Sequence, residues 1–162
     1  QGASGEEVLF REAFHTADGK GRLVPATPAD AAEMPSDDFP WVLITGRQLE
    51  HWHTGAMTRR ARVLDAIEPE PVASLSPDDL ARLGVEPGER VVVSSRRGSV
   101  TMYARLDSAM QPGQVFLPFA YHEAAANLLT NEALDPFGKI PEFKFCAVRV
   151  EPPAKGRRAG AA

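Results

Sequence analysis

Hydrophobic residues in this chain gather in short runs that are separated by turn residues. Some runs are continuous, as in WVLI from Trp41 to Ile44, and predict buried strands. In others apolar and polar side chains alternate, as from Val100 to Leu106, which is typical of a strand with one buried face. We expect strands at residues 41–45, 72–75, 91–95, 100–106, 115–118 and 143–150. Strands this short, with a turn roughly every 8 to 12 residues, favour a mainly β protein built as a closed or nearly closed β-barrel.

Helical patterns are few and brief. Ser76 is expected as the N-cap of a short helix, with Pro77 at its first position and Gly84 as its terminator. Residues 122–129 are expected to form a second short helix. The segment from residue 45 to 62 has no clean period of either kind, so a loop with one helical turn near its end is predicted.

The residues before the barrel have a different composition. Asp18-Gly19 lies between apolar residues and is typical of a hairpin turn, whereas the following segment is rich in proline and acidic residues, as linkers are. The sequence begins QGASGEEVLF, without an initiator methionine or a secretory signal, so we expect a fragment of a larger polypeptide. We therefore divide the chain into the tail of a preceding domain (1–24), a linker (25–40), a barrel domain (41–151) and a disordered tail (152–162).

Composition limits the classes of function. With 162 residues, 43% of them hydrophobic, the chain can bury one core, and its net charge of -4 does not call for a nucleic-acid partner. The single cysteine, Cys146, cannot form an internal disulfide, which favours a reducing compartment such as the cytoplasm. No apolar run reaches the ~18 residues expected of a membrane span.

The stretch TGRQLEHWHTGAMTRR, directly after the first strand, is rich in hydrogen-bond donors. Residues 45–62 contain four arginines but only one carboxylate, Glu50, so a local charge of about +3 interrupts an acidic protein. Gly46 and Gly55 would allow the backbone to approach a ligand closely, and exposed N–H groups after a strand can bind phosphate. The alternative is an ordinary solvated arginine-rich loop.

Two histidines in the same stretch suggest two kinds of chemistry. In an extended segment His51 and His53 would lie on one side, and with His122 and Cys146 they could supply four zinc ligands. The chain has no CxxC or HExxH spacing, however, so we assign no metal ligand. Neutral histidines more often donate N–H groups to phosphate, base or carbonyl oxygens, and Cys146 is most simply a small core residue.

Two polar residues in the last third of the chain leave alternatives open. Alternation would place Lys144 on the same face as Cys146 and Val148, where a lysine either reaches solvent or meets a negative group. Asn127, in AAANLLTN, is either an amide at the end of a helix or a reader of a purine edge.

Together, TGRQLEHWHTGAMTRR and NLLTNEALDPFGKIPEFKFCAVRV resemble the C-terminal dinucleotide-binding domain of prokaryotic molybdopterin oxidoreductases. The resemblance runs from Trp41 to about Glu151. It implies a six-stranded double-psi β-barrel that closes over a molybdenum or tungsten atom held by two molybdopterin guanine dinucleotides. It also implies that Phe119 lies near the substrate and that the pterin dinucleotide is contacted by Thr45, Gly46, Arg47, Gln48, Leu49, Glu50, His51, Trp52, His53, Thr54, Asn127 and Lys144.

Within this family, MTRRARVLDAIEPE and ANLLTNEALDPFGKIPEFK look most like the formate dehydrogenase α subunit of the soluble, NAD-dependent type. That resemblance implies a parent enzyme that oxidises formate to CO2 and passes electrons through iron–sulfur centres to NAD. Its partners would be the other α-subunit domains and the iron–sulfur and NAD/flavin subunits. No catalytic residue is expected in this chain, which alone would be inactive. A nitrate reductase with the same cofactor and a non-enzymatic double-psi barrel remain as alternatives.

Overall fold

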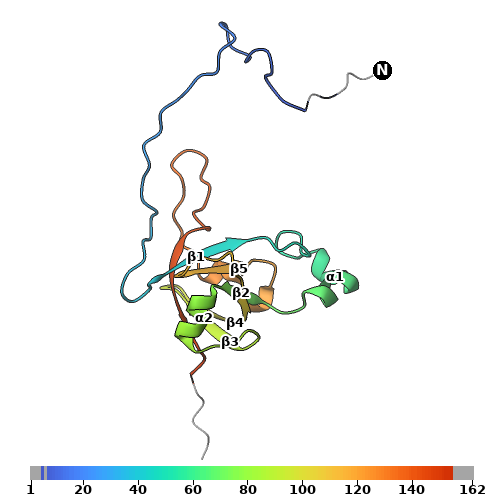
Figure 1. Cartoon of the computed structure of the whole chain (residues 1–162), viewed down its shortest axis with the longest axis vertical. Coiled ribbons are helices and arrows are strands. Elements are labelled where there is room, and N and C mark those ends of the chain that lie inside the picture. Colours follow the sequence, from blue (N-terminus) through green and yellow to red (C-terminus); the bar gives the residue numbers. More distant parts are fainter. Residues whose placement is uncertain (1–4, 6, 155–162) are drawn as a thin grey trace, which may run out of the picture.

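A computed structural model describes residues 5 and 7–154 of the chain. Six strands form a closed barrel, and the few helices are short and lie outside it (Figure 1). The strands are β1 (Trp41–Gly46), β2 (Val72–Leu75), β3 (Arg90–Ser94), β4 (Ser99–Leu106), β5 (Gln114–Pro118) and β6 (Cys146–Glu151). The helices are α1 (Arg62–Ile67) and α2 (Pro77–Leu83), with 3-10 turns η1 (Thr58–Arg60), η2 (His122–Ala124) and η3 (Ala126–Leu128).

The barrel closes in the strand order β1-β5-β2-β4-β3-β6. The pairs β1/β5 and β2/β4 are parallel, and the other four pairs are antiparallel. The expected six-stranded, mainly β barrel is therefore confirmed. Closure leaves no unpaired sheet edge, which suits a chain that has little helix to cover one.

One hydrophobic core fills the barrel. Buried residues alternate with more exposed ones in β3 and β4, whereas all four residues of β2 are buried. Leu43, Val91, Leu117 and Val148 are completely buried. The expectation that Cys146 is a small core residue is confirmed: it is completely buried, and burial raises the pKa of its thiol. The barrel therefore contains a hydrophobic core of its own.

Helix α2 forms as its sequence predicts. The Ser76 hydroxyl accepts a hydrogen bond from the backbone N–H of Asp79 at 3.1 Å, and Gly84 ends the helix with φ 63°. Asp79 is only 1% exposed, and its carboxylate accepts hydrogen bonds from the Ser76 hydroxyl at 2.9 Å and from the Gly113 N–H at 2.8 Å. This carboxylate therefore joins the helix to the turn before β5, a long-range contact that N-cap patterns do not predict.

Some secondary-structure predictions need correction. The turn at Asp18-Gly19 forms, with Phe14 donating its N–H to Gly19 at 2.9 Å, but no strand flanks it among the described residues. Residues 122–129 form two 3-10 turns instead of one helix. η1 lies where a helical turn was expected near the end of residues 45–62, and α1, at residues 62–67, follows it without having been predicted. α1 buries none of its side chains, and Val63 and Ile67 are 74% and 58% exposed.

The last strand begins at Cys146, three residues later than expected, and this changes the surroundings of Lys144. The regular alternation does not extend back to Lys144, whose side chain is exposed and lies 5.7 Å from the centre of the Phe143 ring. Lys144 therefore does not share a face with Cys146 and Val148, and the cost of burying a lysine does not arise.

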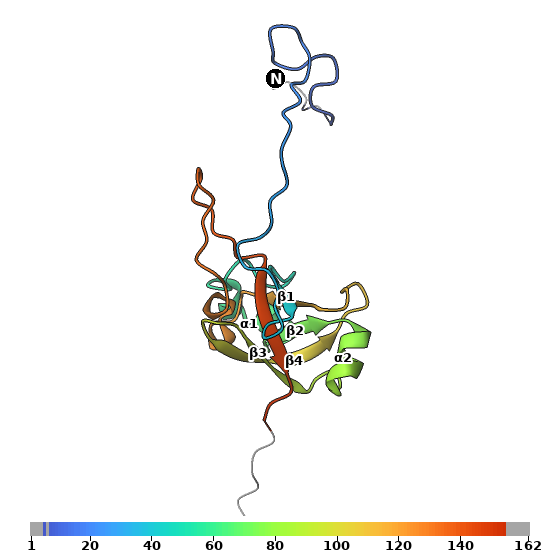
Figure 2. The same cartoon turned by 90° about the vertical axis from the view of Figure 1, so that its left-hand side faces the viewer.

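Two segments extend beyond the barrel. Residues 7–30 run away from it without regular structure, and an arm formed by residues 131–145 projects on the same side (Figures 1 and 2). The linker, residues 25–40, has no helix or strand. Residues 155–162 of the expected disordered tail, and residues 1–4 and 6, lie outside the described part. None of the described helices is long and apolar enough to cross a membrane.

Candidate functional site

The strand topology brings the three candidate segments to one end of the barrel. Because β1 and β5 are parallel, with Gly46 opposite Pro118, the loops that follow both strands leave at the same end. β6 is antiparallel to β1, with Cys146 opposite Leu43, so the residues before β6 arrive there as well. The loop after β1, the turns after β5 and the end of the arm are thus neighbours.

Hydrogen bonds hold these segments together. Phe119, after β5, donates its N–H to the Gly46 carbonyl at 3.1 Å. The Thr45 hydroxyl, only 2% exposed, donates to the Phe143 carbonyl at 2.6 Å. Phe119 itself is half-buried and packs against the core. The chain beside Lys144 is therefore fixed to the end of β1.

Gly46 and Gly55 are both required by the packing of the protein itself. A Cβ at Gly46 would lie 2.6 Å from the Phe116 ring. Gly55 has φ +73°, and a Cβ there would lie 2.7 Å from the Ala120 carbonyl oxygen. These glycines let the loop after β1 lie closely against β5 and the residues after it. Close approach to a ligand, for which the sequence favoured them, is not needed to explain them.

The two histidines do not lie on one side as alternation predicted. His51 is 1% exposed, and its ring nitrogens lie 3.3 Å from the Thr58 hydroxyl and 2.8 Å from the Glu68 carbonyl. His53 is exposed and has φ 50°, so the chain turns between them. Both nitrogens of His51 are occupied within the protein, and His51 therefore acts by holding the loop.

Tyr121 is a residue of this end that sequence reasoning missed. Its hydroxyl lies 3.2 Å from Gln48 Oε1 and 3.0 Å from the Glu68 carbonyl, and its ring meets His51 edge to face at 5.7 Å. Burial, with the nearby Glu68 charge, raises its pKa to about 12. An aromatic residue after β5, directly before η2, was the available signal.

The arginines of residues 45–62 differ in their partners. The guanidinium of Arg59 contacts Asp65 at 2.6 Å and Glu123 at 2.9 Å and lies 4.6 Å from the centre of the Tyr121 ring. Its charge is neutralised within the protein. Arg47 is exposed, lies 5.2 Å from the centre of the Trp52 ring, and has no carboxylate partner among the described residues. Arg60 and Arg62 are exposed as well. The positive charge that a ligand could use is therefore smaller than the sequence indicated.

The loop after β1 surrounds an open depression of about 610 Å³, lined by Arg47, Gln48, Leu49, Glu50, His51, Trp52, Thr58 and Leu64. Gln48 has a side-chain nitrogen, Nε2, that is buried and has no hydrogen-bond partner in the described part of the chain. An unpaired buried donor costs about 1–3 kcal/mol, which an acceptor on a ligand would offset. Leu49 is 97% and Trp52 56% exposed, so apolar surface is also available there. This combination fits a ligand that carries ring systems and many acceptor oxygens.

The remaining expected contacts lie outside this depression. Asn127, in η3, and Lys144 are both exposed, but neither lines it. Thr54 is exposed at the far end of the loop. Within the described residues, no three His, Cys, Asp or Glu side chains are placed to share a metal ion. His122 is exposed and Cys146 buried, so the four residues weighed as zinc ligands are dispersed.

Residues 41–147, which form the barrel and the segments at its end, match the family model described as "Molydopterin dinucleotide binding domain". The chain belongs to this family. The family's ligand, a molybdopterin dinucleotide, carries many acceptor oxygens. The unpaired donors of the loop after β1 fit such a ligand. A solved structure agrees in fold: acetylene hydratase from Pelobacter acetylenicus is similar with a TM-score of 0.66 and 17% identity, over 77% of this chain and 21% of that one.

Three curated relatives of this dinucleotide-binding domain are formate dehydrogenase α subunits. The F420-dependent formate dehydrogenase subunit alpha of Methanocaldococcus jannaschii is 45% identical over 148 residues, 91% of this chain. The α subunits of the F420-dependent formate dehydrogenases 1 and 2 of Methanococcus maripaludis are 41% and 40% identical. The chain spans 22% of the length of each of these relatives.

Proposed function

We propose that the chain is the C-terminal domain of a molybdenum or tungsten formate dehydrogenase α subunit and that it holds one molybdopterin guanine dinucleotide. The observation that carries this proposal is the loop after β1, where Arg47 and Gln48 Nε2 have no acceptor of their own beside an open depression. All three relatives named above are formate dehydrogenases, which favours formate over nitrate as the substrate of the parent enzyme.

Each part of the site has its own task in the proposal. Arg47 binds phosphate oxygens as a charged fork, and the Gln48 amide donates to a further oxygen. The backbone N–H groups and side chains from Thr45 to Thr54 line the same loop, with His51 holding it in shape from inside. Asn127 reads a base edge, and Lys144, which is exposed, reaches a phosphate as a point charge.

The chain orients the cofactor and leaves the reaction itself to other domains of the α subunit. When bound, the metal carried by two such dinucleotides supplies the redox chemistry that converts formate to CO2, a proton and two electrons. Phe119 lies at the end of the barrel on which the loop after β1 closes, and we place it near the substrate. No catalytic residue is assigned to this chain, so the isolated domain is proposed to be inactive.

The electron acceptor separates two versions of the parent complex. The motifs resemble the NAD-dependent, cytoplasmic type, with iron–sulfur and flavin subunits as partners, whereas the three relatives are named as F420-dependent. In either version the other α-subunit domains are the immediate partners. Incubating the parent enzyme with formate and with NAD or F420 in turn decides between them, because only the true acceptor is reduced at a sustained rate.

A titration tests the binding site in this chain directly. GDP carries the guanine, ribose and diphosphate of the proposed ligand, so it should shift the backbone amide signals of Gly46 and Thr54 in a nitrogen–proton spectrum. Inorganic phosphate serves as the control for charge alone and should shift fewer signals, at higher concentration. A spectrum that stays unchanged at millimolar GDP would favour the non-enzymatic barrel instead.

A further inference from the structure

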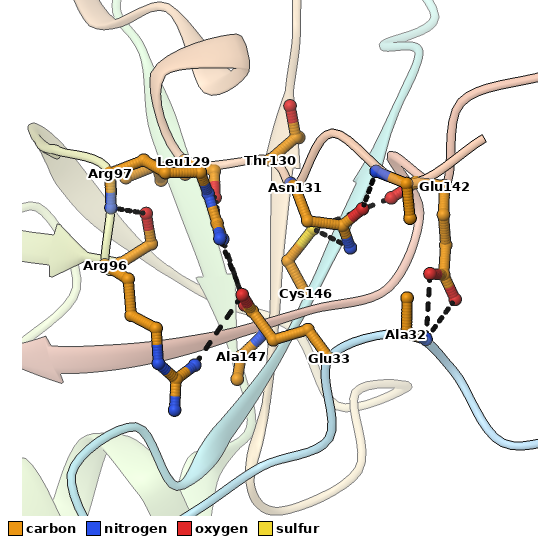
Figure 3. A network of polar contacts seen from close by, with 12 residues as sticks. Ala32, Glu33, Arg96, Arg97, Leu129, Thr130, Asn131, Glu142, Cys146 and Ala147 are labelled. Atoms are coloured by element: carbon orange, nitrogen blue, oxygen red, sulfur yellow. Dashed lines mark hydrogen bonds and ion pairs between the residues drawn. The ribbon is translucent and has the colours of Figure 1, made fainter.

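One residue of the linker is built into the barrel. Glu33 is only 14% exposed at its side chain, and its carboxylate contacts the Arg97 guanidinium at 2.6 Å and 2.9 Å (Figure 3). It also accepts a hydrogen bond from the backbone N–H of Ala147 at 2.9 Å, while Arg96 lies 3.6 Å away. Paired, charge-assisted contacts of this kind fix geometry in a way that a flexible tether does not.

Arg97 connects Glu33 to the turn that carries Asn127. Its Nε and Nη2 atoms both donate to the Leu129 carbonyl, at 3.0 Å and 2.7 Å, so the guanidinium lies between Glu33 and the end of η3. The hairpin turn of Arg97 packs tightly here, since a Cβ at Gly98 would lie 3.1 Å from the Leu128 carbonyl oxygen. Leu129 is two residues from Asn127, and the Thr130 hydroxyl donates to the Asn127 carbonyl at 3.3 Å.

The Ala147 contact reaches the segment of Lys144. Beside Ala147, the Cys146 sulfur accepts a hydrogen bond from the Asn131 N–H at 3.3 Å, and the Asn131 side chain donates to the Phe145 carbonyl at 3.3 Å. These bonds close the base of the arm formed by residues 131–145, next to Glu33 (Figure 3). Lys144 lies within that closed base.

We infer that Glu33 is a positioning residue for dinucleotide binding. It fixes the Asn127 turn through Arg97 and the Lys144 segment through Ala147, and we call these contacts the Glu33 clasp. The inference rests on the proposed function, in which Asn127 and Lys144 contact the dinucleotide. Because Glu33 lies on the connection to the preceding residues, the clasp also makes the position of the linker part of the binding site.

Hydrogen exchange and GDP affinity together test the clasp in the 162-residue chain. Glu33→Ala should raise amide exchange at residues 128–131 and 147 about tenfold, as expected when a charge-assisted hydrogen bond is lost, and weaken GDP binding several-fold. Exchange at residues 47–54 should stay unchanged. Glu33→Gln retains an acceptor for Ala147 and should give an intermediate result, and Arg97→Lys, which loses the planar fork, should resemble Glu33→Ala. Glu86→Ala, which removes an exposed carboxylate in the turn before β3, is the control and should resemble the wild type.

The outcomes separate the clasp from the binding proposal. Unchanged exchange at residues 128–131 in Glu33→Ala would overturn the clasp, whether or not the GDP affinity changes. Faster exchange with unchanged GDP affinity would overturn the positioning role. The affinity of the wild type for GDP is measured first on the same sample. If the wild type does not bind GDP, the proposed function is contradicted, but the exchange result still tests the clasp. Exchange in the β2 and β5 core shows whether a variant is folded, and Glu33→Gln replaces Glu33→Ala if it is not.

Discussion

The Tyr121 hydroxyl shares its single proton between Gln48 Oε1, at 3.2 Å, and the Glu68 carbonyl, at 3.0 Å. One buried side chain from the turns after β5 thereby fixes the loop after β1 and the segment that leads into β2. The Gln48 amide nitrogen is left with no partner among the described residues, next to the open depression. Tyr121 thus fixes the orientation of the Gln48 side chain.

Removing this hydroxyl should loosen the loop. Tyr121→Phe leaves Gln48 Oε1 without a donor, while the Glu68 carbonyl keeps its contact with His51 at 2.8 Å, so we expect the free energy of unfolding to fall by about 1–3 kcal/mol. Amide exchange at residues 48–51 should rise as well. Tyr103→Phe is the matched control, because the Tyr103 hydroxyl only accepts an exposed contact from Arg90 at 3.4 Å, and it should cost less than about 0.5 kcal/mol. Equal losses in urea unfolding of the two variants would contradict this role.

Gly55 allows a separate test of how closely the loop lies against the barrel. Gly55→Ala and Gly113→Ala both place alanine at positive φ, +73° and +81°, which costs about 1–2 kcal/mol in each case. Only Gly55 also meets the Ala120 carbonyl, at 2.7 Å, whereas Gly113 faces open space. We expect Gly55→Ala to lose a further ~1–3 kcal/mol through overpacking. The same thermal shift in both variants would show that the loop moves aside freely.

Acid should weaken the Glu33 clasp. The hydrogen bond with Arg97 holds the pKa of Glu33 below its ordinary value of 4.5, despite partial burial, which acts in the opposite direction. Because the folded-state pKa is the lower one, this carboxylate stabilises the protein above pH 4.5 and loses that effect as the pH falls through the folded-state pKa. The unfolding free energy of the wild type should therefore fall more steeply than that of Glu33→Gln. Urea unfolding at about pH 6.5 and about pH 3.5 measures the loss of unfolding free energy in each protein. Equal losses in the wild type and Glu33→Gln would contradict the prediction.

The barrel could be predicted from the sequence because its signals are local. Alternation in β4, the continuous run of β1 and the capping residues Ser76 and Gly84 all act within a few residues of their element. α1 and the true start of β6 could not be predicted in this way. α1 has no buried face, and β6 starts only where Cys146 and Ala147 pair with β1, a contact made across about a hundred residues of chain.

The candidate site could be located from the sequence but not resolved into roles. TGRQLEHWHTGAMTRR identified the right loop, yet the opposite surroundings of Arg47 and Arg59 depend on Glu123, which lies far away in sequence. The burial of His51 likewise depends on Glu68 and Tyr121. A motif gives the identity of the donors, whereas the folded chain decides which of them already have partners.

Arg47 gives the most direct test of the loop as the dinucleotide-binding element. In the parent enzyme, metal and guanine nucleotide are counted per α subunit for the wild type, Arg47→Ala and Arg149→Ala. Arg149 is an exposed arginine on β6, paired with Glu151 at 3.2 Å, and serves as the charge control. Loss of a charge-assisted phosphate contact corresponds to about a tenfold weaker affinity, so Arg47→Ala should contain several-fold less of both, and Arg149→Ala a normal amount. Normal metal and nucleotide content in Arg47→Ala would contradict the binding role of this loop.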